Sequence, residues 1–172
     1  MQQIVSFFWQ MCLLRESPAR LPSTPFTLGL IVACYLVIAL VAVNVTRPSQ
    51  TVPAVIGIVL TGMGVQAVLT YGLLAFKRIG SRFLATWSSL LGTNTIMLLI
   101  LLPINLTLMN TEHETLTMFI DSVSWICLGW WLAIAGYILH KAADISILQG
   151  SALAFVMELL GVIVSVSLFP AS

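Results

Sequence analysis

Three polar side chains inside long apolar stretches are the residues of this sequence best suited to chemistry: Gln66, Asn94 and Glu158. An ionisable group inside a membrane span costs roughly 2.5–3.5 kcal/mol on insertion scales, so Glu158 needs a reason to be there. Each of the three lies ten to thirteen residues from the same end of the span predicted to carry it. At about 1.5 Å rise per residue, they should lie within about one helical turn of each other in depth.

Two interpretations of this polar set compete. If the three side chains face one another, they form a buried, hydrogen-bonded cluster in which burial favours a neutral Glu158 that ties helices together. Each such bond is worth roughly 0.6 kcal/mol and at most about 2 kcal/mol. The alternative makes Glu158 a proton or cation relay, or the anchor of a polar ligand. The structural interpretation is favoured, because no second buried carboxylate or basic partner continues a relay.

Small residues recur at steps of three and four along two later stretches, and such seams let helix backbones approach closely in lipid. One seam comprises Ser122, Trp125, Gly129, Ala133 and Gly136, and the other comprises Ser151, Ala154, Gly161 and Ser165. A short connection over 140–144 makes the two helices antiparallel neighbours, so the seams predict an intramolecular helix hairpin. A helix from another protein is the alternative occupant of one seam.

The elements that must position these residues are membrane helices. The sequence is 59% hydrophobic and 8% charged, whereas a soluble domain is about 25% charged. Five stretches reach the roughly 20 apolar residues that a spanning helix requires: 26–45, 52–76, 83–106, 116–139 and 145–169. We therefore expect an all-α membrane protein in which residues 26–172 form one five-helix transmembrane domain.

Residues 1–25 form a separate segment. Ile4, Phe7, Phe8 and Met11 recur at helical spacing, which is typical of an amphipathic helix, and Pro18, Pro22 and Pro25 follow it. A helix lying in the membrane interface fits this pattern best. The alternative is a helix packed against the bundle.

Basic residues predict the orientation of the bundle. Six of them fall on one side of a five-span arrangement, and only Arg47 falls on the other; the six are Arg15, Arg20, Lys77, Arg78, Arg82 and Lys141. We therefore expect a cytoplasmic amino terminus and a carboxyl terminus on the outside.

Several function classes lack support in the sequence. A net charge of +1 without a basic stripe argues against nucleic-acid binding. The three cysteines are scattered, and the sequence contains no nucleophile–base pair, phosphate loop or metal-ligand spacing. We therefore expect no catalytic residues, no cofactor and no bound metal.

The chain resembles small five-span bacterial membrane proteins of the Yip type. The likeness rests on the amphipathic start, on Arg15-Glu16-Ser17-Pro18 and Leu21-Pro22, on Leu90-Leu91-Gly92-Thr93, on Gly136-Tyr137-Ile138-Leu139 and on the ending Leu168-Phe169-Pro170. It implies a protein of the bacterial inner membrane that organises or binds partners and has no catalytic residues. The Asp-Leu-Tyr-Gly-Pro signature of eukaryotic Yip relatives is absent, so the likeness does not extend to GTPase-linked trafficking.

Short loops and the lack of an active-site pattern predict a non-enzymatic accessory or scaffold protein, in contact with the lipid bilayer and with other integral membrane proteins. The alternative is a small transporter or proton-coupled channel subunit centred on Glu158, with Gln66 and Asn94 beside it.

Overall fold

The computed structural model describes residues 2–18, 24–46, 49–109 and 114–170. The described residues form an all-α structure in which five helices are long and apolar enough to cross a membrane, as predicted. These five are α2 (Pro25–Thr46), α3 (Val52–Phe76), α4 (Phe83–Met109), α5 (Glu114–Ala143) and α6 (Ile147–Leu168). They are preceded by α1 (Gln2–Cys12), and a short 3-10 helix, η2 (Gly80–Arg82), joins α3 to α4.

The turn between the last two spans differs from the prediction. Residues 140–144 were expected to break the helix, but α5 continues through Ala143. His140 and Lys141 lie in its last turn, where basic side chains interact favourably with unpaired carbonyl groups. The chain reverses at Asp144, which has a φ of 53°, and a capping box at Ser146 then starts α6.

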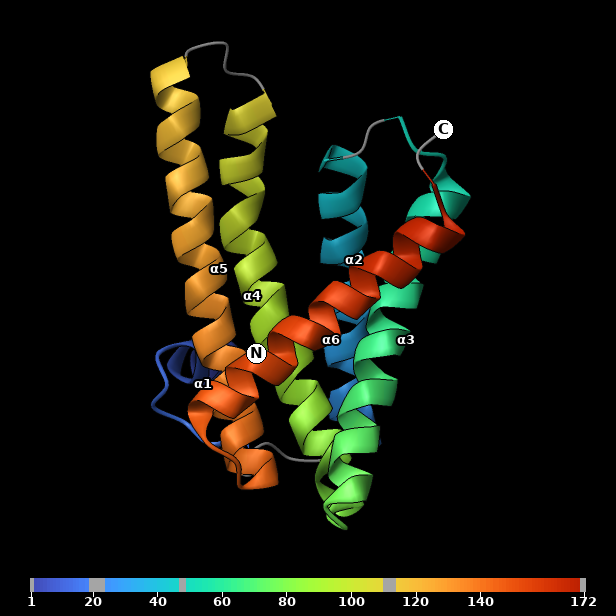
Figure 1. Cartoon of the computed structure of the whole chain (residues 1–172), viewed down its shortest axis with the longest axis vertical. Coiled ribbons are helices and arrows are strands. Elements are labelled where there is room, and N and C mark those ends of the chain that lie inside the picture. Colours follow the sequence, from blue (N-terminus) through green and yellow to red (C-terminus); the bar gives the residue numbers. More distant parts are fainter. Residues whose placement is uncertain (1, 19–23, 47–48, 110–113, 171–172) are drawn as a thin grey trace.

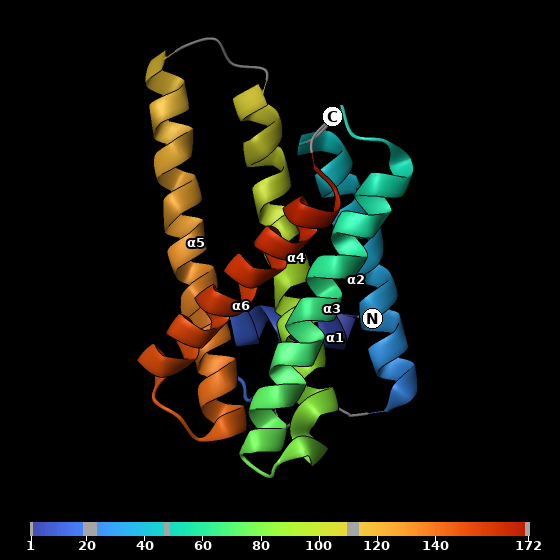
Figure 2. The ribbon, with the colours of Figure 1, turned by 45° about the vertical axis from the view of Figure 1, so that its right-hand side comes forward.

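Two turns meet at one end of the bundle, which we call the basic end because it carries Lys77, Arg78, Arg82 and Lys141. The Arg82 guanidinium donates a hydrogen bond to the carbonyl of Ala142 at 3.2 Å. Leu74, Ala142 and Ala143 form a small buried cluster beside it. The carboxyl end of α6 lies at the opposite, far end of the bundle (Figure 2).

The five spans close a ring. α5 packs against α6, α6 against α3, α3 against α2, α2 against α4, and α4 against α5. The largest core cluster gathers residues of α4 and α5, among them Leu90, Met97, Ile134 and Ile138, together with Met11 from α1. α4 and α5 also extend past the other spans at the far end (Figure 1).

Two glycines let the backbones of α5 and α6 touch near the basic end. A Cβ atom on Gly136 would lie 2.8 Å from the carbonyl oxygen of Ile147, and a Cβ atom on Gly150 would collide with the carbonyl oxygen of Gly136. The Ser151 hydroxyl donates to the carbonyl of Leu132 at 2.9 Å. In lipid, close packing and hydrogen bonds of this kind hold helices together, so this contact fixes where α6 starts.

Beyond this contact α6 leaves α5 and crosses to α3 (Figure 1). A Cβ atom on Gly161 would lie 3.8 Å from the Cα atom of Gly62, and the Ser165 hydroxyl donates to the carbonyl of Ile58 at 3.3 Å. The ring of Phe169 then lies against Gly57. The buried face of α6 therefore packs first on α5 and then on α3.

The two seams were predicted to pack against each other along their whole length, and the crossing of α6 shows that this prediction is wrong in the far half. Gly136, Ser151 and Ala154 lie in or beside the α5–α6 contact. In the far half the seams do not meet, because the tilt of α6 carries Gly161 and Ser165 to α3. Of the remaining seam residues on α5, Ala133 is half-buried, whereas Ser122, Trp125 and Gly129 are exposed.

The contact predicts that Gly136→Leu destabilises the protein while Gly129→Leu does not. Overpacking of a tight contact costs about 1–3 kcal/mol, whereas a Cβ atom on Gly129 has no neighbour within 4 Å. Thermal unfolding of both variants in a mild detergent checks this expectation. Equal unfolding midpoints for the two variants would contradict the crossing.

Candidate functional site

A cavity of about 230 Å³ lies between α2, α3, α4 and α6. Gln66 from α3, Asn94 from α4 and Glu158 from α6 all line it. The structure thus brings together three residues that the sequence predicts to lie at a similar depth in the membrane. Two hydroxyl groups, those of Tyr35 and Ser165, add to the polar part of the lining.

The polar residues face the cavity and do not bond to one another. No hydrogen bond joins any two of Gln66, Asn94 and Glu158, all three of which belong to the described part of the chain. Gln66 is 8% exposed, Asn94 is half-buried, and the protein leaves Glu158 accessible. Gln66, Asn94 and Glu158 therefore line one cavity and do not form the buried, hydrogen-bonded cluster that the structural interpretation predicts.

The geometry of α6 explains this difference. Met157 and Gly161 belong to its buried face, and Met157 accepts a weak hydrogen bond from Thr70 of α3 at 4.0 Å. Glu158 is one position further round the helix, and a turn of 3.6 residues places it beside that face and not on it. The carboxyl group consequently lies at the cavity, next to the α3–α6 contact.

Tyr35 is a cavity residue that the reasoning from sequence missed. It lies ten residues into α2, which begins at the same end of the bundle as α4 and α6. Counting residues from the same end of each span, as for Gln66, Asn94 and Glu158, also places Tyr35 at this depth. A tyrosine hydroxyl is therefore a signal that the sequence does contain. Tyr35 adds an aromatic ring and a hydroxyl group to a site that otherwise offers amides and a carboxyl group.

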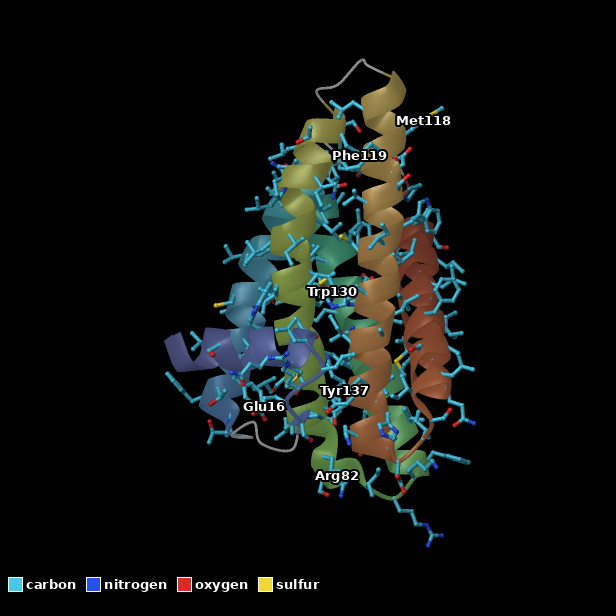
Figure 3. All side chains as sticks on the ribbon, turned by 90° about the vertical axis from the view of Figure 1, so that its left-hand side faces the viewer. Glu16, Arg82, Met118, Phe119, Trp130 and Tyr137 are labelled. Atoms are coloured by element: carbon cyan, nitrogen blue, oxygen red, sulfur yellow. The ribbon has the colours of Figure 1, made fainter. Side chains whose placement is uncertain are left out.

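A second candidate surface is the outward side of α5 in its far half, which we call the free face: Met118, Phe119, Ser122, Trp125, Ile126 and Gly129. All six residues are exposed, Trp125 to 73%. Figure 3 shows Met118 and Phe119 near the far end of α5. Met118, Ser122, Trp125 and Gly129 continue the line of Gly136, so the free face extends the surface that binds α6 nearer the basic end.

α1 lies across the flank of the bundle beside α4 and α5 (Figure 3). The Trp130 indole donates a hydrogen bond to the carbonyl of Cys12 at 2.9 Å. The ring of Phe8 lies against Gly92, and Met11 and Cys12 are fully buried at 0% exposure. α1 is thus docked on protein through its apolar side.

The four residues predicted to enter the membrane interface have different surroundings. Phe8 and Met11 are buried in the protein, and Phe7 is half-buried. The side chain of Ile4 lies outside the described residues. The contacts of Phe8 and Met11 match the alternative of a helix packed against the bundle. An amphipathic stripe can be buried equally well by lipid or by neighbouring helices, which is why the sequence did not separate the two.

No three His, Cys, Asp or Glu side chains are grouped as a metal site in the part of the chain that the structure describes. No family model matches the chain, and neither a curated protein nor a solved structure matches it. Its function is therefore inferred from its own residues and their geometry.

The docking of α1 can be followed through Cys12. Burial raises the pKa of its thiol from 9.0 to about 11, so at pH 8 almost none of it is the reactive thiolate. In a variant that keeps Cys12 as its single cysteine, we expect slow labelling by N-ethylmaleimide. Gly92→Leu should accelerate labelling at least about tenfold, because the new side chain displaces Phe8 and releases α1.

The matched control is Gly64→Leu, since a Cβ atom on Gly64 has no neighbour within 4 Å. It should label as slowly as its parent. Rapid labelling of the parent itself would show that α1 is not docked.

Proposed function

We propose that this protein is a non-enzymatic accessory or scaffold protein that binds other integral membrane proteins. The observation that carries the proposal is the free face of α5. No helix of the described part of the chain covers its far half, although the same side of α5 packs tightly against α6 at Gly136.

The residue types on the free face suit a transmembrane helix as its occupant. Gly129 and Ser122 leave room for a close backbone approach, and Trp125 offers a large aromatic contact. Helices associate in lipid through small residues and packing, since lipid tails already satisfy apolar surface. A partner helix lying where α6 departs would extend the packing that Gly136 begins.

The resemblance to Yip-type proteins supports the same class of function and a location in the bacterial inner membrane. The basic end supports the orientation, since Lys77, Arg78, Arg82 and Lys141 gather there and basic residues favour the cytoplasmic side. The amino terminus is then cytoplasmic and the carboxyl terminus periplasmic. The exposed side chains Trp9, Leu13 and Leu14 would let the docked α1 segment also touch the membrane interface.

Photo-crosslinking tests the free face. With p-benzoylphenylalanine in place of Trp125, we expect a discrete protein adduct after irradiation of native membranes. The matched control is Val68, which is 70% exposed on α3 and should give lipid adducts alone. Gly129→Leu should abolish co-purification of the partner while leaving the unfolding midpoint unchanged. Lipid adducts alone at both positions 125 and 68, together with no co-purifying protein after gentle detergent extraction, would contradict the proposal.

The cavity favours a second candidate, a small transporter or proton-coupled channel subunit centred on Glu158. A carboxyl group, two amides and a phenol line one space among four helices, and carboxyl groups within membrane spans mark ion and proton pathways. This candidate assigns the accessible Glu158 a role that partner binding leaves open.

Proton uptake into proteoliposomes under an imposed potential distinguishes this candidate from a purely structural carboxyl group. Glu158→Gln keeps a hydrogen-bonding side chain of the same length but removes the titrating group. We expect a coupled transporter to lose at least about nine-tenths of its proton flux in this variant, with an unchanged unfolding midpoint. Equal flux in wild type, Glu158→Gln and protein-free liposomes would exclude proton coupling.

A further inference from the structure

We propose that the cavity is a binding site for a small organic cation, a protonated amine with an apolar body, and that Glu158 is its counter-ion. The proposal concerns binding alone. It names the ligand class for the transport candidate. The binding experiment tests it independently of transport and of partner binding.

The cavity extends towards the far end of the bundle. Val43, Ile58 and Val166 belong to its lining, and each lies within two to six residues of the far end of its helix. At about 1.5 Å per residue, these positions are roughly 3–9 Å from the helix ends. Tyr35, Gln66, Asn94 and Glu158 lie deeper, near mid-span. The lining is therefore apolar towards the far end and carries its carboxyl and amide groups near mid-span.

The charge of the lining selects a cation. Among the described residues that line the cavity, Glu158 is the single charged side chain and none is basic. A carboxylate at this depth is stabilised by a positive charge, and the hydrogen bond from an ammonium group to a carboxylate is among the stronger ones in proteins. The Tyr35 ring adds a surface over which an ammonium group is attracted.

The size and shape of the site favour an organic cation over a bare metal ion. Metal ions such as Ca²⁺ need oxygen ligands on several sides at about 2.3–2.6 Å. Here Gln66, Asn94 and Glu158 line a space of about 230 Å³ without hydrogen bonds to one another, and much of the remaining wall is apolar, including Ala39, Leu98 and Val162. That wall suits a hydrocarbon body attached to the charged head.

The small volume of the cavity also favours a small molecule over a partner helix. An α-helix with its side chains is about 10–12 Å across and would have to separate α2, α3, α4 and α6 to occupy the cavity. A lysine reaching inward from a helix outside the ring is the competing occupant, and the experiment below is designed to detect it.

Three probes that share one apolar body test the proposal: benzylammonium, benzyl alcohol and benzoate. Calorimetric titration at pH 7 uses the full chain in lipid nanodiscs, with empty nanodiscs subtracted. We expect benzylammonium to bind saturably. Benzyl alcohol and benzoate should show no saturable binding. Glu158→Gln should weaken benzylammonium binding at least about tenfold, because it removes the charge-assisted bond.

Two further variants keep the result interpretable. Asp121→Asn removes an exposed carboxyl group of α5 that does not line the cavity, and it should bind as tightly as wild type. Val162→Phe fills the cavity from an exposed position of α6 and should reduce binding although Glu158 is intact. Both variants should retain the wild-type unfolding midpoint.

Three outcomes would overturn the proposal. They are the absence of saturable benzylammonium binding, equal affinity for benzyl alcohol, and unchanged affinity in Glu158→Gln. If benzylammonium does not bind and carbodiimide joins Glu158 to a lysine of a co-extracted protein, the carboxyl group belongs to a partner helix. Binding without proton flux would exclude proton coupling and leave the cation site in place.

Discussion

The close approach of α5 and α6 at Gly136 and Gly150 is the contact on which the rest of the arrangement depends. The backbones touch there, and the Ser151 hydroxyl donates to the carbonyl of Leu132. A larger side chain at either glycine would move the helices apart. Because the contact involves the first turns of α6, it leaves the direction of the remaining turns to be set by α3.

Both candidate surfaces follow from the path of α6. As α6 crosses to Gly62 and Ile58, it leaves the far half of α5 uncovered and produces the free face. The same crossing holds Glu158 beside the α3–α6 contact, with Gln66 and Asn94 around one cavity. The free face and the polar cavity are thus two consequences of a single tilted helix.

α1 illustrates how an amphipathic pattern leaves its environment open. The periodic apolar residues are real, but Phe8 and Met11 pack against protein and Trp9 remains exposed. The hydrogen bond from Trp130 to the carbonyl of Cys12 then holds the end of α1 against α5. Satisfying a carbonyl at a helix end, where the backbone has no partner of its own, stabilises the docked position.

By itself the sequence determined the class of protein, the number of spans and the depth of its polar residues. These properties depend on composition and on the fixed rise of a helix, so Gln66, Asn94 and Glu158 could be assigned to one level, and Tyr35 could have joined them. The sequence also identified the small-residue face of α6. Only the tertiary structure decided which neighbour each face meets, because Gly161 and Ser165 suit α5 and α3 equally well. The tilt of α6 and its backbone contacts place these two residues against α3. The same tilt leaves Trp125 exposed and leaves a cavity beside Glu158.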